Sequence, residues 1–195
     1  MQSTTSALPV PDPDLIQRAR RGDPGSITWL FERYQPVLFR YLYYRLGDWQ
    51  SAEDLTSEVF IRMLRALPGY QPQAAPFQGW LFLIARNLAV DHFRRSGRSE
   101  TLGENLSALD PLPEKALENA LDHDRLREAL SRIKDDQREV LILRFILDVP
   151  IAEVAGLVGK SGNAVKGLQR RGLARLRDVL STGEPEDAVR EERPR

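Results

Sequence analysis

Six basic residues gather in one short stretch near the end of this 195-residue chain, against a single acid. The basic residues between positions 160 and 178 are Lys160, Lys166, Arg170, Arg171, Arg175 and Arg177. Ammonium and guanidinium groups bind phosphate oxygens, and polar side chains near the start of a helix reach base edges in the major groove. The side chains suited to base edges are Asn163, Lys166, Gln169 and Arg170. This chemistry is that of a DNA-reading helix, and a solvated positive face is the alternative.

The elements that must position these side chains are two helices joined by a tight turn, between residues 149 and 180. Apolar residues at three- and four-residue spacing give each helix one inward face. Ala155, Gly159 and Val165 have the spacing of a helix-turn-helix, in which the small residue permits close approach and the glycine bends the chain. Ser161 is placed to cap the second helix through its hydroxyl. The turn spacing favours a DNA-reading helix over a solvated face.

A second polar group lies on a helix expected between residues 48 and 67. Asp54 and Glu58 are four residues apart, so they share one helix face, with Glu53 and Ser57 adjoining. Such an acidic patch suits a partner surface rich in arginine. A solvated acidic face is the alternative interpretation.

Composition excludes several classes of function. The net charge is zero and there is no cysteine, which leaves no disulfide framework and no cysteine-ligated zinc. The two histidines, His92 and His123, lie far apart and have no neighbouring metal-ligand spacing. No phosphate-binding glycine loop or metalloprotease motif occurs, so we expect neither an enzyme, a cofactor, a metal nor a small-molecule substrate. No apolar run is long enough for a membrane span, which predicts a cytoplasmic protein.

The hydrophobic periodicity predicts an all-α chain of two small helical domains joined by a flexible acidic linker. The expected segments are a disordered start (1–13), a first helical domain (14–98), the linker (99–119), a second helical domain (120–181) and a disordered tail (182–195). Asp14 is expected to cap the first helix. Pro36 is expected to kink or break the second helix near Tyr34.

Several ordered motifs run through both predicted domains. The first domain carries LIQRARRGDPGSITWLFERYQPVLFRYLYYRLGD, then SAEDLTSEVFIRMLRAL, then APFQGWLFLIARNLAVDHFRR. The second carries QREVLILRFI followed by the helix-turn-helix. Together these motifs resemble the extracytoplasmic-function (ECF) group of the sigma-70 superfamily of sigma factors, over about residues 14 to 180. The resemblance implies a promoter-specificity subunit that binds core RNA polymerase and initiates transcription.

The resemblance assigns a binding surface to each cluster of residues. The segment AEDLTSEVF is similar to the part that docks on the clamp helices of the largest polymerase subunit, and the second domain is expected to meet the flap region. The residues implied for core-polymerase binding are Glu53, Asp54, Ser57 and Glu58. The acidic linker corresponds to a family segment that runs through polymerase channels.

The family resemblance also implies that the first domain opens and reads the minus-10 promoter element. Opening DNA needs cations along the backbone and a surface that holds an unpaired base. The residues implied for minus-10 binding are Tyr70, Phe77, Arg86, Asn87, Arg94 and Arg95. Trp80 has the helical spacing of a core residue and is assigned to the core rather than to base stacking.

The helix-turn-helix is then implied to read the minus-35 element. The residues implied for this contact are Ser161, Asn163, Lys166, Gly167, Gln169, Arg170 and Arg171. The chain reads VKGLQRRGL where the family commonly has VKSRLHRAR, so Leu168 and Leu173 replace basic residues. Gln169 replaces an apolar residue and is either a base reader or a half-buried polar group. Gly167 is interpreted as a place of close backbone approach to DNA.

Two other functions remain open at this level. A stand-alone helix-turn-helix regulator would bind a palindromic duplex without polymerase. A protein-interaction adaptor without DNA binding would not need the cluster of basic residues between positions 160 and 178. The family resemblance further implies an anti-sigma factor as a partner, although no residue identifies it.

Overall fold

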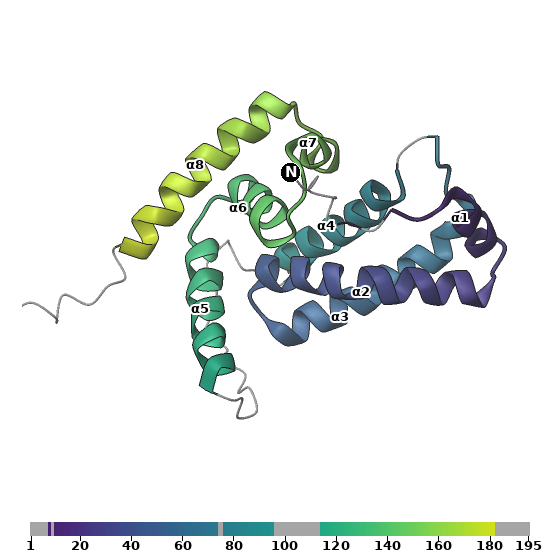
Figure 1. The fold of residues 1–195 in the computed structure, drawn as a ribbon, viewed down its shortest axis with the longest axis horizontal. Helices are drawn as coiled ribbons and strands as arrows, with labels where there is room; N and C mark the ends of the chain where they lie inside the picture. The colour runs from purple at the N-terminus through teal and green to yellow at the C-terminus, as the bar shows by residue number, and fades with distance from the viewer. Residues whose placement is uncertain (1–7, 9, 74–75, 96–113, 182–195) are drawn as a thin grey trace, which may run out of the picture.

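The computed structural model describes residues 8, 10–73, 76–95 and 114–181, with side chains from 123 onward in the last range. Within these ranges every regular element is helical and no strand occurs (Figure 1). The all-α fold predicted from the periodicity is therefore confirmed. The predicted tail (182–195) and most of the predicted linker lie outside the described residues.

The N-terminal half consists of helices whose ends follow from local residues. Its elements are α1 (Pro13–Arg20), α2 (Pro24–Leu46), α3 (Trp49–Ala66), a 3₁₀ turn η1 (Leu67–Gly69) and α4 (Phe77–Arg95). The carboxylate of Asp23 accepts a hydrogen bond from the Ser26 amide at 2.8 Å and so caps α2. Gly47 ends α2 in the left-handed conformation with φ 78°, and Asp48 caps α3.

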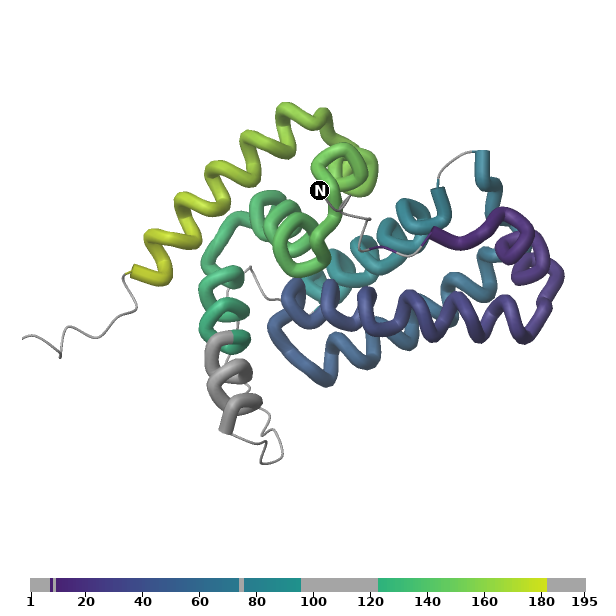
Figure 2. The backbone as a smooth tube through the Cα atoms, viewed as in Figure 1, coloured from purple at the N-terminus to yellow at the C-terminus, as the bar shows by residue number. Residues whose placement is uncertain are grey.

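The C-terminal half contains the expected helix-turn-helix. Its elements are α5 (Glu114–Ser131), α6 (Asp135–Leu141), a π-helical turn η2 (Ile142–Ile146), α7 (Ile151–Val158) and α8 (Gly162–Ser181). The helix α5 begins at Glu114, within the segment 99–119 that the sequence assigned to the linker. Figure 2 shows the green helices α6 and α7 of this half close to the blue and teal helices of the first, whereas the yellow α8 lies beyond α6.

Two local predictions were wrong. The cap of α1 is Asp12, whose carboxylate accepts a hydrogen bond from the Asp14 amide, because Pro13 and not residue 15 begins the helix. The helix α2 also runs unbroken past Pro36, so the break near Tyr34 does not occur, while the kink given as its alternative stays a prediction. Pro36 cannot donate a backbone hydrogen bond, which costs the helix free energy. The packing of the buried residues Tyr34, Leu38 and their neighbours on α2 contributes more than this cost.

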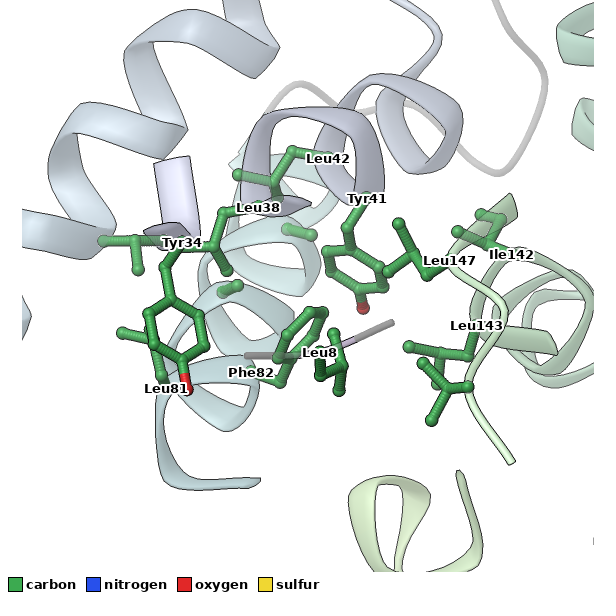
Figure 3. Packing of buried hydrophobic residues seen from close by; sticks show 14 of the residues in the cluster. Leu8, Tyr34, Leu38, Tyr41, Leu42, Leu81, Phe82, Ile142, Leu143 and Leu147 are labelled. Atoms are coloured by element: carbon green, nitrogen blue, oxygen red, sulfur yellow. The ribbon is translucent and has the colours of Figure 1, made fainter. Parts of the chain in front are cut away.

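One hydrophobic core continues across both halves. In the first half, α2 packs against α3 and α4. Figure 3 shows Tyr41 and Phe82 from this half facing Leu143 and Leu147 of the second half, with Leu8 beside them. All five side chains are buried. The two halves therefore meet through an apolar seam, which the prediction of two tethered domains did not include.

The helix α6 lies in the middle of the second half and touches elements on both sides. It packs on α8, and the following turn η2 packs on α2. Six consecutive residues, 138 to 143, are buried. A segment that is buried on all sides is typical of the inside of a protein, and this one, the end of α6 and the start of η2, is enclosed by α8 on one side and by the first half on the other.

Candidate nucleic-acid interface

The helix-turn-helix has the geometry that the sequence predicts. Gly159 makes the turn in the left-handed conformation with φ 64°, and Ser161 Oγ accepts a hydrogen bond from the Ala164 amide at 3.2 Å. Val165 and Leu168 are buried and fasten α8 to its neighbours. The capping by Ser161 is confirmed. The opposite face of α8 is consequently turned towards solvent.

The basic and polar side chains of α8 lie on that solvent face. Lys166, Arg170 and Arg171 are exposed, and Asn163 is exposed in the first turn of the helix. Gly167 lies between them, and a Cβ placed on it would be 3.3 Å from an Nη atom of Arg171. The guanidinium of Arg171 thus lies back over Gly167. Four groups that can bind phosphates or base edges are presented on one helix without competing protein partners in the described residues.

Gln169 differs from its neighbours on α8. Its side chain is half-buried, and its Oε1 is enclosed without a hydrogen-bond partner among the described residues. Of the two alternatives in the sequence, this geometry matches the half-buried polar group. An unpaired buried amide oxygen costs about 1–3 kcal/mol.

The acidic residues of α3 share a surface with exposed apolar residues. Glu53, Asp54 and Ser57 are exposed, and Glu58 is half-buried and pairs with Arg62 at 2.8 Å. Four large apolar side chains are also exposed on α2 and α3, and sequence reasoning did not single them out as a surface; they are Phe31, Trp49, Ile61 and Leu64. Ile61 follows Asp54 by seven residues and so continues the same helix face. The surface is acidic at one end and apolar at the other.

The aromatic residues predicted to hold an unpaired base are packed together. Tyr70 and Phe77 are 5% and 4% exposed, and their rings meet edge to face at 5.7 Å. Trp80 lies 4.8 Å from the ring of Tyr70 and remains half-buried. The three rings form one cluster in which Trp80 keeps the most contact with solvent. Base stacking by Tyr70 or Phe77 stays a prediction, because either ring must leave this cluster first.

The predicted cations of α4 fall into two groups. Arg94 and Arg95 are exposed at the end of the helix, and Asn87, which follows Arg86 directly in the chain, is exposed as well. Arg86 instead donates its Nε–H to Glu139 Oε2 at 3.1 Å, a residue of α6 in the other half. The structure therefore leaves Asn87, Arg94 and Arg95 on open surface of α4 and engages Arg86.

The sequence is similar to known transcription proteins in both halves. The family profile described as Sigma-70 region 2 matches residues 30–99, and the one described as Sigma-70, region 4 matches residues 123–176. The ECF RNA polymerase sigma factor SigD of Mycobacterium tuberculosis is 34% identical over 85% of this chain and 82% of its own length. The chain belongs to the ECF sigma-factor family. The RNA polymerase sigma factor function predicted from the motifs is confirmed, and the stand-alone regulator is not favoured.

Other relatives of this sigma factor agree in sequence and in fold. The ECF sigma factor BldN of Streptomyces coelicolor is 38% identical over 90% of this chain, which spans 66% of the length of that relative. The structure of the sigma factor RpoE in complex with the anti-sigma factor NepR from Bartonella quintana superposes with a TM-score of 0.64. It covers 80% of this chain and 98% of the other, at 22% identity, and so shows the shared fold.

The sigma factor has a buried polar network where regions 2 and 4 meet. Arg45 of α2 is 1% exposed and donates to both carboxylate oxygens of Asp135 on α6, with Nη2 and Oδ2 2.6 Å apart. Tyr41 donates its hydroxyl to Glu139 Oε1 at 3.2 Å. The ring of Phe93 lies under the guanidinium of Arg45, with 5.7 Å between Cζ and the ring centre. The buried cation of the first half thus pairs with a carboxylate of the second half across the seam.

The environment fixes the charge state of this network. Burial opposes the charge of Arg45, but its hydrogen bond to Asp135 and the nearby Tyr41 raise its pKa above the ordinary value. Burial would also raise the pKa of Asp135, yet the hydrogen bond and charge of Arg45 hold it below its usual range. Burial, and then the charge of Glu139, raise the pKa of Tyr41, so the phenol stays neutral and donates.

Sequence reasoning missed this network, although one signal was present. Arg45 continues the apolar face of α2 four residues after Tyr41, and a cation at such a position indicates a buried partner. Among the described residues no group of three potential ligands could hold a metal ion. None of the described helices combines the length and the apolar character that a membrane span requires.

Proposed function

We propose that this sigma factor binds core RNA polymerase through α3, reads the minus-10 element with region 2 and reads the minus-35 element with region 4. The proposed domains are residues 14–98 and 120–181, joined by 99–119. The observation that carries the proposal is the exposed basic face of α8, on a chain whose α3 presents a separate acidic and apolar surface. One face suits DNA and the other suits a protein partner.

The surface of α3 has the composition of a protein interface. Glu53, Asp54, Ser57 and Glu58 supply charge for a basic partner surface such as the polymerase clamp helices. Ile61 and Leu64 add apolar area that would otherwise face water. Arginine-rich partners are thereby steered to the acidic end and packed at the apolar end.

The DNA contacts divide between the two regions. On α8, Lys166, Arg170 and Arg171 bind the backbone or base edges of the minus-35 element, with Ser161 and Asn163 at the helix start. Gln169 contributes to packing rather than to base reading, given its enclosed oxygen. On α4, Arg94 and Arg95 bind the minus-10 backbone, Asn87 contacts a base edge, and the cluster of Tyr70, Phe77 and Trp80 borders the unpaired base.

The remaining assignments follow from membership in the family. The chain has no catalytic or cofactor chemistry of its own, acts in the cytoplasm where core polymerase is found, and also contacts the flap region through region 4. An anti-sigma factor is a further partner. The support is the fold shared with RpoE, which is bound to the anti-sigma factor NepR in its structure.

Run-off transcription with purified core polymerase on fragmented bacterial genomic DNA tests the function. Discrete start sites that require this protein are expected, and they define both promoter elements at once. Duplex binding by the protein alone, with no new transcripts, would indicate the stand-alone regulator instead.

Charge reversal tests the proposed polymerase-binding surface, with association to the same purified core polymerase as the measurement. Replacing Asp54→Lys and Glu58→Lys together should abolish association with core polymerase, because both charges lie in the acidic patch. The matched control reverses Glu32 and Glu128, which are exposed on α2 and α5 outside this patch. Unchanged binding of the first variant would remove the patch from the interface.

A further inference from the structure

Four residues of α4 are exposed along Phe77–Arg95, a helix that the structure describes throughout. Three of them, Asn87, Arg94 and Arg95, are polar and belong to the surface proposed to read the minus-10 element. The fourth is Leu83, which is 47% exposed. One large apolar side chain thus lies within a surface that otherwise consists of groups proposed to bind DNA.

Leu83 shares one face of α4 with residues on both sides of it in the chain. It follows Trp80 by three residues and precedes Asn87 by four, which are the spacings of neighbours on a helix surface. The residues just before it, Leu81 and Phe82, are buried, and Figure 3 shows both among the core side chains. The packing of α4 therefore rests on other residues, and a substitution at position 83 should leave the fold intact.

The order of residues on this face gives Leu83 a position on the DNA. Trp80 belongs to the aromatic cluster proposed to border the unpaired base, and Asn87 is proposed to contact a base edge. At about 1.5 Å of helix axis per residue, Leu83 lies about 4.5 Å beyond Trp80 and about 6 Å before Asn87. These steps are comparable with the spacing of stacked base pairs, about 3.4 Å. Leu83 is therefore placed at the junction between the unpaired base and the next base pair.

We propose that Leu83 is a wedge, which holds the promoter open by covering the base pair next to the unpaired base. The inference rests on the proposed function, because it adds a residue to the same minus-10 surface. When a base turns out of the stack, the flat face of the neighbouring pair is left in water. Contact with Leu83 removes this face and the exposed part of the side chain from water together, as apolar wedges do between unstacked base steps.

The chemistry of leucine limits the stage at which Leu83 acts. Its side chain neither donates nor accepts a hydrogen bond, so it gains nothing from the phosphates that Arg94 and Arg95 are proposed to bind. The faces of the base pairs are hidden within the stack of a closed duplex. Leu83 is therefore expected to stabilise the open complex and to leave the affinity for closed DNA unchanged. The two arginines contribute to both complexes through their charge.

Promoter opening by the holoenzyme, reconstituted from core polymerase and the full chain, tests the wedge. The probe is the promoter mapped by run-off transcription, with 2-aminopurine in the minus-10 element, because this base fluoresces more strongly when it leaves the stack. Leu83→Ala should lower the equilibrium constant for opening by about tenfold, since it removes most of the apolar contact area. Leu83→Met keeps the apolar volume and should restore opening, whereas Leu83→Gln should not. Gel-shift affinity for the closed complex on ice should be the same for every variant.

A promoter with mismatched bases in the minus-10 element separates opening from the other steps of initiation. Its strands are unpaired before the protein binds, so transcription from it no longer depends on a residue that stabilises the opened state. The difference between Leu83→Ala and the unaltered chain should therefore shrink to less than about twofold on this template.

The matched control is Leu180→Ala, which truncates a leucine of similar exposure, 44%, at the end of α8. It should open the promoter as the unaltered chain does. Equal opening by Leu83→Ala and this control would overturn the inference. A matching loss of closed-complex affinity would also overturn it, because Leu83 would then be a groove contact, and so would a defect that persists on the mismatched promoter. If the unaltered chain gives no transcripts from either template, the proposed function itself fails.

Discussion

The two proposed DNA surfaces of this sigma factor differ in their access to solvent. The basic face of α8 is open, whereas α4 has one cation engaged by α6 and its aromatic residues packed in a cluster. A helix that enters a duplex groove can be presented ready-made, because the groove exists before the protein arrives. A surface that holds an unpaired base has no partner until the DNA opens, so its cations and rings find partners within the protein. Four changes test this contrast.

The largest effect is expected at the ion pair that joins the two regions. Arg45→Ala should lower the free energy of unfolding by about 2–4 kcal/mol, because it empties buried space and leaves Asp135 without its main partner. Asp135 is 38% exposed, which keeps the loss below that of a fully enclosed pair. Urea denaturation followed by circular dichroism measures the change. The exposed pair of Arg132 and Glu128 provides the control, and Arg132→Ala should cost less than about 1 kcal/mol.

Substitutions on the exposed basic face of α8 should weaken DNA binding and leave the stability of the protein unchanged. Arg170→Ala is expected to weaken minus-35-dependent initiation by about 1–3 kcal/mol if it binds a base edge, with no loss of stability, since Arg170 is exposed. Quantitative transcription from promoter variants measures the effect. A uniform loss over all minus-35 variants would assign Arg170 to a phosphate instead.

Two glycines of α8 should respond oppositely to the same substitution. Gly172→Ala should destabilise region 4 by about 1–3 kcal/mol, because the new Cβ would lie 3.1 Å from a methyl carbon of Leu141 and 3.3 Å from Cβ of Gln137. Gly167→Ala meets only the movable end of Arg171 and should stabilise the helix by about 0.5–1 kcal/mol. Thermal denaturation of both variants measures the pair. A further loss of minus-35 binding by Gly167→Ala alone would support close approach of DNA at that position.

Low pH should loosen the packing of α6 against α2 before it affects the exposed basic face of α8. The pKa of Asp135 is low because the hydrogen bond and charge of Arg45 outweigh the opposing effect of burial. A group with a lowered folded pKa contributes its stability above the ordinary value, 3.8, and loses it as the pH falls towards the folded value. The packing should therefore be constant near neutral pH and open below about pH 4. Small-angle scattering over this range measures it, and Asp135→Asn should remove that part of the pH dependence.

The sequence predicted those parts of the structure that depend on neighbours along the chain. The inward face of α2 around Leu38, the turn at Gly159 and the cap at Ser161 all follow from spacing within one or two helical turns. The exposure of the basic side chains of α8 follows from the same periodicity. Each of these features has its cause within a few residues.

The missed features depend on partners far along the chain. Arg45 and Asp135 are 90 residues apart, and Arg86 and Glu139 are separated by 53, so neither pair has a local pattern. The burial of Phe77, the first residue of α4, was not predicted either, and its base stacking stays a prediction. Solvent access, rather than residue type, distinguishes the two roles, and access depends on tertiary packing.

The enclosure of residues 138 to 143 has a consequence for the lifetime of the protein in the cell. When region 4 separates from region 2, apolar side chains such as Leu143 and Leu147 lose their cover. Bare apolar surface of this kind attracts chaperones and proteases and promotes aggregation. An opened sigma factor without polymerase would thus be removed faster than a closed one.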